Sequence, residues 1–405
     1  MNQMPNSWQL LTLGDIANWT SGGTPSSKNS DYYDGDIPWV CIGDLNEGSV
    51  LETAKKITKA GLDSSSAKIM PKGTIMLAMY ATSIGDTGMM ETNMATNQAI
   101  ACGVPNPKMI VGKYLLYYLQ SQKHEFFAAG RGGAQPNINQ GIVKAWPIPV
   151  PSIDEQHKIV ELLEDHLSRL DAALAGVKQA KLKAAQFRRS LLQAGFTGNL
   201  TGGGTRFMTS YPSNWKIESL DSLINRGIIK LNRGDIISKR DIAAHPGDYP
   251  IYSSAKENNG MFGRYGKYMF DEEVITWSID GGGRLFYREK QKFSVTNVGG
   301  ILRIVDRSVF DYKFLFYALT NLHSQVIFDW SRKAHPSVIR MVYDKVPIPP
   351  LSEQHKIVEL LEDHLSRLDA SVAIADAMEK QSSSLRRSLL QAAFTGQLTK
   401  EVASV

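Results

Sequence analysis

The sequence predicts an α+β protein built by duplication, in which two mixed α/β domains alternate with two long helices. Three observations lead to this prediction. The segment EQHKIVELLEDHLSRLDA occupies residues 155–172 and returns, letter for letter, at residues 353–370. Its apolar residues recur at alternating spacings of three and four, as in a helix that pairs with another helix. The stretches before each copy hold short β-type runs separated by Gly, Asp and Asn.

The first domain is expected at residues 1–150. The runs DIPWVCI and GTIMLAMY have the composition of strands, and KYLLYYLQSQ has that of one compact helix. Polar, glycine-bearing stretches such as SGGTPSSKNS and AGRGGAQPN are expected to be exposed loops. This part carries 11 basic and 11 acidic residues, so it has no net charge.

The first helical region is expected at residues 151–201. The prolines of PIPVP cannot continue a helix, so a helix should begin after them, with Asp154 as its N-cap. Its apolar seam includes Leu163, Leu167 and Leu170, and Ala184, Phe187 and Leu191 extend it after a polar break at Lys181. This seam predicts a coiled coil.

The second domain is expected at residues 202–350, after a glycine linker. The runs EEVITWSI and KFSVTNVGGILRIV indicate strands, and YKFLFYALTNL indicates a helix. From residue 206 to 350 the chain has 21 basic and 15 acidic residues, a net charge of +6. Its polar loops interleave Arg, Lys, Ser and Asn with Tyr and Trp, as in nucleic-acid contacts; ordinary solvated loops are the alternative.

The second helical region is expected at residues 351–405, with Ser352 as N-cap and Leu361, Leu365 and Leu368 in its seam. Two equivalent helices related by a pseudo-twofold axis should pair as an antiparallel coiled coil. The alternative is that each helix packs on the core of its own domain. The polar faces of the two copies are also identical, which indicates docking faces for two copies of one partner, or else a recent duplication.

Motifs of catalysis, metal binding and membrane insertion are missing from the sequence. The two cysteines, Cys41 and Cys102, are too few for a disulfide framework, and no apolar run reaches about 18 residues, so a cytoplasmic protein is expected. DGGGR lacks the context of a phosphate loop, and His157 with Glu161 lacks the spacing of a zinc helix. We therefore expect no catalytic residue and no metal.

The chain resembles the specificity subunit of type I restriction–modification enzymes. The resemblance lies in two variable domains, each followed by a near-identical helix that opens with PIPPLSEQHKIV and closes with RRSLLQAAFTGQLT in the second copy. GGTPSSKNSDYYDGDIPWV and YPIYSSAKENNGMFG are similar to the openings of target-recognition domains in that family. GGAQPNIN resembles the loop before the repeated helix.

The resemblance implies a non-catalytic subunit that binds double-stranded DNA at a bipartite, asymmetric site. Each target-recognition domain would read one half-site, and the paired helices would set the spacing and dock two adenine-methyltransferase subunits. S-adenosylmethionine, ATP and Mg are expected on the methyltransferase and restriction subunits and no cofactor on this chain. A self-contained methyltransferase or nuclease is disfavoured because no [DNS]-PP-[YF] or Walker motif occurs. A non-DNA coiled-coil scaffold with two protein-binding end domains stays open.

Loop position and charge select the residues expected to contact DNA: Lys28, Arg131, Lys239, Arg264, Arg284, Arg332 and Lys333. The residues expected to face outward and dock the methyltransferase are Glu161, Glu164 and Arg169, with their counterparts Glu359, Glu362 and Arg367.

Overall fold

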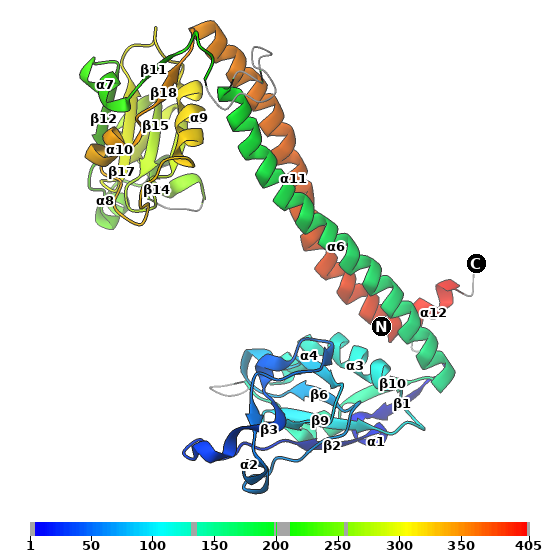
Figure 1. Cartoon of the computed structure of the whole chain (residues 1–405). Coiled ribbons are helices and arrows are strands. Elements are labelled where there is room, and N and C mark those ends of the chain that lie inside the picture. Colours follow the sequence, from blue (N-terminus) through cyan, green and yellow to red (C-terminus); the bar gives the residue numbers. More distant parts are fainter. Residues whose placement is uncertain (1–4, 131–135, 198–199, 201–210, 255–257, 403–405) are drawn as a thin grey trace. The chain divides into compact units, whose positions relative to one another are not determined.

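The computed structural model of the chain describes residues 5–130, 136–197, 200, 211–254 and 258–402 (Figure 1). It divides into two units, Met1–Val177 with Ala377–Val405, and Lys178–Asp376. Each unit holds one α+β domain together with part of each of the two long helices. The predicted duplicated α+β architecture is confirmed. No helix in the described ranges combines the length and the apolar character that a membrane span needs.

The domain of the first unit is built on a five-stranded sheet in the order β2-β9-β6-β7-β4. The predicted helix KYLLYYLQSQ corresponds to α3 (Gly112–Ser121), which packs on β6 and β7 and buries Tyr114, Leu115 and Leu119 in the core. The sheet strands are β2 (Ala17–Ser21), β4 (Ser49–Val50), β6 (Ile75–Ala78), β7 (Thr87–Met90) and β9 (Ile100–Pro105). The remaining elements are β1 (Gln9–Thr12), β3 (Tyr33–Val40), β5 (Lys56–Ile57), β8 (Ala95–Thr96), β10 (Pro147–Val150), α1 (Leu13–Ile16), α2 (Lys59–Asp63), α4 (Lys123–Ala129) and α5 (Gln140–Lys144).

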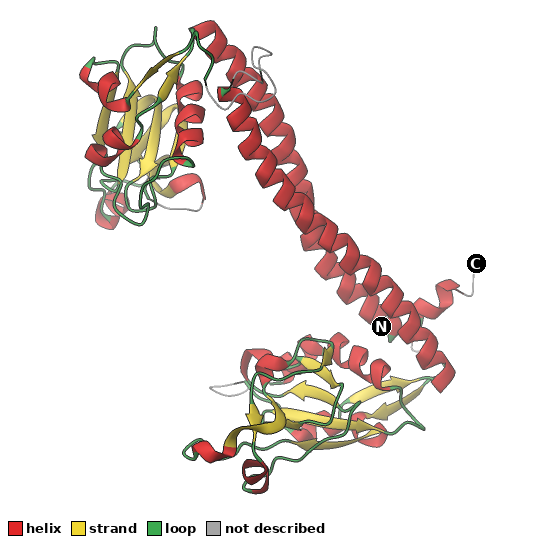
Figure 2. Cartoon of the chain, in the orientation of Figure 1, coloured by secondary structure: helices red, strands yellow, loops and turns green. Residues whose placement is uncertain are grey.

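The domain of the second unit has a six-stranded sheet in the order β12-β17-β15-β16-β13-β14 (Figure 2). The predicted helix YKFLFYALTNL lies in α9 (Tyr312–His323), which packs on β15 and β16 through Phe314, Leu315 and Leu319. The sheet strands are β12 (Ile229–Arg233), β13 (Tyr249–Tyr252), β14 (Met261–Tyr265), β15 (Phe270–Ser278), β16 (Leu285–Val295) and β17 (Gly299–Ile304). Around them lie β11 (Lys216–Glu218), β18 (Val346–Ile348), α7 (Leu220–Asn225), α8 (Lys239–Ala244) and α10 (Pro336–Val342).

The two domains share details that their divergent sequences hide. In the first, β3 runs parallel to β8, and in the second, β13 runs parallel to the end of β16. Gly22 and Gly234 occupy matching positions after the first strand of each main sheet. A Cβ on Gly22 would lie 2.1 Å from the Thr96 carbonyl oxygen, and one on Gly234 would lie 2.5 Å from that of Thr296. Only glycine permits this approach of two backbones.

The two long helices are α6 (Ile153–Phe196) and α11 (Leu351–Ala393), and a short α12 (Gln397–Val402) follows. They start earlier than the expected caps. The Glu155 N–H donates to Ser152 Oγ (3.3 Å), so Ser152, not Asp154, caps α6. In α11 the Pro350 carbonyl accepts from Glu353 N (2.9 Å), which places Ser352 inside the first turn. Each helix thus begins directly after its prolines.

Within each unit the two helices lie side by side and run antiparallel (Figure 1). Arg386 pairs with Asp171 (3.0 Å) in the first unit, and Lys181 with Asp376 (2.6 Å) in the second, where Arg188 also pairs with Asp369. The two residue numbers add to 557 in all three pairs, so one register holds in both units. Lys181, the expected polar break in the apolar seam, forms one of these interhelical pairs.

The seam is apolar toward the helix starts. Leu163, Leu167, Leu361 and Leu365 are at most 5% exposed, and Leu170 and Leu368 are half-buried. The starts also pack on their own domains, as the alternative prediction had it. In the first unit Ile159, Val160 and Leu163 share one core with Tyr114, Tyr118 and, from the end of α11, Leu390 and Phe394.

The seam prediction is wrong at Phe187, which is 52% exposed, and Leu385, at the matching position of α11, is 48% exposed. The next residue in each helix, Arg188 or Arg386, reaches an aspartate of the opposite helix. Because successive residues on a helix differ by about 100° in direction, the preceding residue turns away from the seam.

Candidate functional site

A buried glutamine attaches the start of each long helix to its domain. Gln156, with no exposed surface, accepts a hydrogen bond from Val111 N (2.8 Å) through Oε1. Its Nε2 donates to the carbonyls of Met109 (3.0 Å) and Pro151 (2.9 Å). These bonds hold the turn before α3 against the first turn of α6, so Gln156 has a structural role inside its unit.

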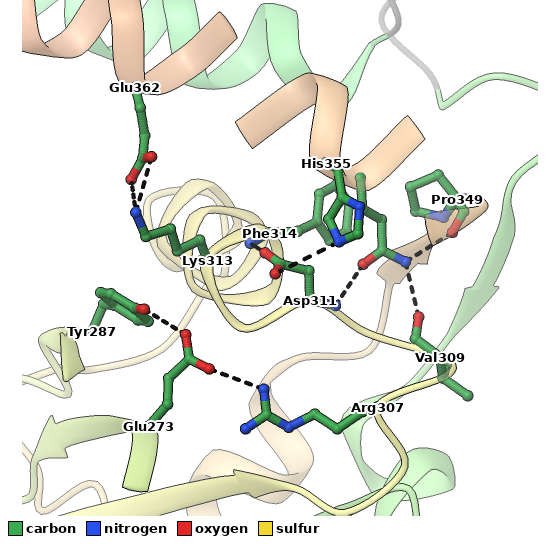
Figure 3. Close-up of polar contacts among 11 residues, drawn as sticks. Glu273, Tyr287, Arg307, Val309, Asp311, Lys313, Phe314, Pro349, His355 and Glu362 are labelled. Atoms are coloured by element: carbon green, nitrogen blue, oxygen red, sulfur yellow. Dashed lines mark hydrogen bonds and ion pairs between the residues drawn. The ribbon is translucent and has the colours of Figure 1, made fainter. Parts of the chain in front are cut away.

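The second copy makes the same attachment. Gln354 is also fully buried; its Oε1 accepts from Asp311 N (2.9 Å), and its Nε2 donates to the carbonyls of Val309 (2.8 Å) and Pro349 (2.8 Å). Figure 3 shows Asp311, Val309 and Pro349 converging on the start of α11. The same residue, glutamine, stands at this position in both copies because it joins a long helix to a domain in the same way in each unit.

A second attachment lies two turns further along each helix. Glu164 accepts from Lys113 Nζ (2.6 Å) and Tyr117 Oη (3.2 Å) of α3, and Glu362 pairs with Lys313 (2.7 Å) of α9 (Figure 3). Burial, together with the Glu164 carboxylate, raises the pKa of Tyr117 to about 12. Glu164 and Glu362, which were expected to face outward, thus each pair with a lysine of the adjoining domain, while their side chains stay 40% and 39% exposed.

The contact network of the second unit continues from α9 into the sheet. Glu273 of β15 accepts from Tyr287 Oη of β16 and from Arg307 Nη1 (2.9 Å) (Figure 3). Lys313 Nζ lies 5.7 Å from the centre of the Tyr287 ring. Burial and the Glu273 carboxylate raise the pKa of Tyr287 well above its ordinary value. The sheet, α9 and α11 are thus linked by polar contacts as well as by their core.

Most of the remaining polar residues of the repeated segment face solvent. Arg169 pairs with Asp165 (3.0 Å) and Arg367 with Asp363 (3.0 Å), both along their own helix. Two residues approach a domain: Glu155 accepts from Trp8 Nε1 (3.1 Å), and His355 lies 4.0 Å from Asp311. Contacts within the described chain thus leave the identity of this set unexplained. The set, here called the repeated helix face, consists of His157, Lys158, Glu161, Asp165, Ser168 and Arg169, with His355, Lys356, Glu359, Asp363, Ser366 and Arg367.

Three loops of the second domain join into one exposed surface, here called the loop surface: residues 253–254 with 258–260, residues 279–284 and residues 327–335. The Asp280 N–H donates to Ser254 Oγ (3.2 Å). Lys333 pairs with Asp280 (3.4 Å), and Ala334 N donates to the Ile279 carbonyl (2.8 Å).

The structure sorts the candidate DNA contacts of this domain into two groups. Arg284, Arg332 and Lys333 are exposed on the loop surface. Lys239 opens α8 and Arg264 lies on β14, two elements that pack together; both side chains are exposed, and Arg264 Nη1 donates to the Asp248 carbonyl (2.7 Å). All five are placed where a large ligand can reach them.

The loop surface rests on a histidine that sequence reasoning did not single out. The ring centres of His323 and Trp330 are 3.8 Å apart, and His323 Nδ1 lies 3.0 Å from Tyr343 Oη. A Cβ on Gly283 would lie 2.3 Å from the Trp330 ring, so Trp330 packs directly on the 279–284 loop. Burial lowers the pKa of His323. No spacing in the sequence marks these residues as partners.

In the first domain Lys28 is exposed in the loop after β2, and Arg131 lies outside the described residues. Lys123 of α4 joins two neighbouring loops through Glu47 (2.6 Å) and Asp86 (2.8 Å). These loops, residues 41–48 and 79–86, directly follow β3 and β6. Two loops of the loop surface, those that begin at residues 253 and 279, follow β13 and β15 in the same way.

Metal or thiol chemistry finds little support. Within the described ranges no group of three or more His, Cys, Asp and Glu side chains could hold a metal ion. Both cysteines are free, Cys102 is buried, and burial raises the pKa of its thiol to about 11.

A family model described as type I restriction modification DNA specificity domain matches residues 5–183 and again 212–376. The specificity subunit of the type I restriction enzyme MjaIX of Methanocaldococcus jannaschii is 24% identical over 89% of this chain and 88% of that protein. The EcoDI specificity subunit of Escherichia coli is 24% identical over 98% of this chain and 90% of its own length. A type I specificity subunit assigned in Mycoplasma pneumoniae is 34% identical, but the match spans 34% of this chain and 45% of that protein.

Two solved structures have the same fold. One, from work on complex assembly and conformational transition of a type I R–M system, has a TM-score of 0.72 at 15% identity and covers 98% of this chain and 99% of that chain. The HsdS subunit of Thermoanaerobacter tengcongensis has a TM-score of 0.59 at 16% identity over 97% of this chain and 98% of its own.

Proposed function

Because the chain belongs to the type I restriction modification DNA specificity family, we propose that it selects the DNA sequence for a type I restriction–modification complex. It is the non-catalytic subunit of that complex. Each domain, residues 1–150 and 202–350, reads one half of a bipartite, asymmetric site. The helical regions, residues 151–201 and 351–405, set the unread spacing between the halves.

The observation that carries this proposal is the contrast between what is repeated and what differs. Both units have the same start of the long helix, the same contacts of a buried glutamine, and the same pair between a glutamate of the long helix and a lysine of the domain. The loops at matching positions differ in sequence and charge: residues 41–48 read CIGDLNEG, whereas residues 253–260 read SSAKENNG. Two equal frames that present unlike loops are suited to reading two unlike half-sites.

DNA contact is supported by charge and placement. Arg284, Arg332 and Lys333 are exposed on the loop surface, and Lys239 and Arg264 are exposed at α8 and β14. Cations supply the phosphate contacts that position a protein on a duplex, and guanidinium and amide groups read base edges. Lys28 and Arg131 are the corresponding candidates of the first domain.

The repeated helix face supports docking of two copies of one partner, which we infer to be an adenine methyltransferase that carries S-adenosylmethionine. The candidate residues are Glu161, Arg169, Glu359 and Arg367, all exposed, together with Glu164 and Glu362, which also pair with lysines of the adjoining domains. Restriction subunits that use ATP and Mg would complete the complex, which would act in the cytoplasm.

The test is to purify the full-length chain from its native cell and identify the proteins that accompany it. Mapping of methylated adenines in the genome should then show a bipartite motif that disappears when the gene is deleted. A methyltransferase in the complex and a lost motif support the proposal. A methylation pattern unchanged by deletion contradicts it, and other partners without DNA binding would favour a coiled-coil scaffold.

A further inference from the structure

The loop after β13 has an uncommon backbone. Asn258, Asn259 and Gly260 all have positive φ angles, 47°, 52° and 77°. The left-handed region is strained for residues with a side chain; Asn tolerates it best after Gly, and usually only as a single residue. Three such residues in succession need support from the surrounding structure, and backbone strain of this kind collects at functional sites.

Arg288 of β16 provides that support. It is 2% exposed; its Nη1 donates to the Asn259 carbonyl (2.9 Å) and its Nε to Thr276 Oγ1 (2.9 Å). Ser253 N donates to the Gly260 carbonyl (2.9 Å) and closes the turn. The guanidinium lies over the Tyr252 ring, 3.6 Å from its centre. The turn is therefore fixed from beneath by a buried side chain.

Arg288 is a buried cation whose contacts are two aromatic rings, a hydroxyl and a backbone carbonyl. Within the described part of the chain no carboxylate forms an ion pair with it, and its Nη2 has no hydrogen-bond partner. Taking a cation out of water without a counter-ion is costly, and an apolar residue would fill the same space without that cost. An arginine here serves to hold the position of the Asn258–Gly260 turn.

The side chains of Asn258 and Asn259 point to solvent from this fixed turn, for both residues are exposed. Arg284, an exposed cation of the same loop surface, contacts the ring that Arg288 also contacts. Arg284 of the loop surface is 5.3 Å from the centre of the Phe286 ring, and Arg288 is 4.7 Å from the same centre. Two primary amides are thus carried on a backbone turn that a buried guanidinium holds.

We propose that Asn258 and Asn259 read adenine in the half-site of the second domain, with Arg288 as the residue that positions them. The inference rests on the proposed function and deepens it by naming the base. A primary amide pairs with the N6–N7 edge of adenine as a unit, accepting from N6 and donating to N7, and no other base edge in the major groove offers this pattern. Such a pair needs the amide held within a fraction of an ångström, which a mobile loop does not provide.

Glycine substitutions separate the amides from the turn. Asn258→Gly and Asn259→Gly keep the left-handed backbone, which glycine adopts without strain, and remove only the side chains. The full-length chain, purified with its partner subunits, is used to select duplexes from a randomised DNA pool. The double variant should lose preference for A·T at pairs of the second half-site by about 5- to 150-fold, the equivalent of about 1–3 kcal/mol.

The half-site of the first domain is the internal control and should keep its preference. An unchanged profile overturns the proposal, as does a loss confined to G·C pairs. Equal weakening of all sequences also overturns it, because it marks phosphate contacts. Arg288→Lys, which keeps the charge and loses the fork, should relax the same A·T pairs; relaxation elsewhere contradicts its positioning role. Wild-type protein that selects no bipartite sequence would defeat the proposed function itself, a result distinct from all of these.

Discussion

Gln156 and Gln354 make the same three hydrogen bonds in the two units of the chain. Each accepts from one backbone N–H before a domain helix and donates to two backbone carbonyls, at 2.8–3.0 Å. Both side chains are fully buried, so water cannot replace these bonds. The direction of each long helix relative to its own domain is therefore fixed by one side chain together with the apolar core around it.

Removing this side chain should destabilise the second unit. Gln354→Ala leaves the Asp311 N–H and the carbonyls of Val309 and Pro349 without partners. We expect the free energy of unfolding to fall by about 3 kcal/mol, since each buried unsatisfied group costs about 1–3 kcal/mol and the space left by the shorter side chain can admit water that relieves part of this cost. Calorimetry should show one of the thermal transitions lowered by roughly 10 °C. Lys356→Ala, two residues along and exposed, is the matched control; an equal effect of both would contradict the assigned role.

The repeated helix face should govern partner stoichiometry. Charge reversal at Glu161 and Arg169 should leave a complex with one methyltransferase, and reversal in both copies should leave none. Because these side chains are exposed, folding should change by less than about 0.5 kcal/mol. Native mass spectrometry measures the stoichiometry. Full occupancy in the fourfold variant would rule out this face as the docking surface.

The cations of the second domain should contribute to DNA affinity without selecting sequence. Lys239→Gln removes an exposed charge at the start of α8. If it contacts a phosphate, the slope of log K against log salt should fall by about 0.9, equally for specific and random duplexes. Titration by fluorescence anisotropy at several salt concentrations provides the slope. Lys290→Gln, exposed on β16 away from the loop surface residues, serves as comparison, and equal slopes in both variants and wild type would remove Lys239 from the interface.

The fold around the loop surface should lose stability in mild acid. Burial lowers the pKa of His323 from its ordinary value of 6.5, so the folded state binds fewer protons than the unfolded state. Its contribution to stability is thus present above about pH 6.5 and is lost as pH falls through that range. His323→Gln should reduce the difference in unfolding free energy between pH 7.5 and 5.5. A difference of the same size in the variant would assign the pH dependence to other groups.

Much of the architecture was predictable because its signals are local. The helix repeat, the prolines before it and the apolar spacing of α3 and α9 each act within a few turns, so the sequence pattern shows them directly. The matching Gly22 and Gly234 illustrate the opposite case. Each touches a strand far away in the sequence, and nothing near either glycine reveals that contact.

The candidate site was predicted less well, for a physical reason. A glutamate on a predicted helix looks the same whether it meets solvent or a lysine of another element. Glu161 is exposed, whereas Glu164, three residues on, is held by Lys113. Likewise, the burial of Arg288 and the stacking of His323 on Trp330 depend on tertiary packing, which the local sequence does not show. The exposure of Arg284 and Lys333 could be predicted, because polar, glycine-bearing loops lie on the surface.

The last prediction concerns the spacing between half-sites. Adding seven residues to each long helix, after Val177 and after Ala375, lengthens both by the same amount. Equal insertions keep one common register for the interhelical pairs Asp171–Arg386 and Arg188–Asp369, and seven residues keep the heptad seam. Lys181 and Asp376 lie between the two insertion points, so this pair is separated and the inserted residues take its place. Each helix gains about 10 Å, at 1.5 Å per residue. At about 3.4 Å per base pair, the unread spacer should lengthen by about three pairs, with the bases of both half-sites unchanged.

Methylation mapping of cells that carry the lengthened chain measures this directly. Three added pairs also turn one half-site by roughly 100° around the duplex, at 10–10.5 pairs per turn, so methylation at the new site should be weaker than at the original one. Inserting seven residues into α6 alone is the control: it breaks the register with α11 and should abolish methylation at every spacing. Undiminished methylation at the original spacing by the doubly lengthened chain would show that the helices do not set the distance, because neither domain has been altered.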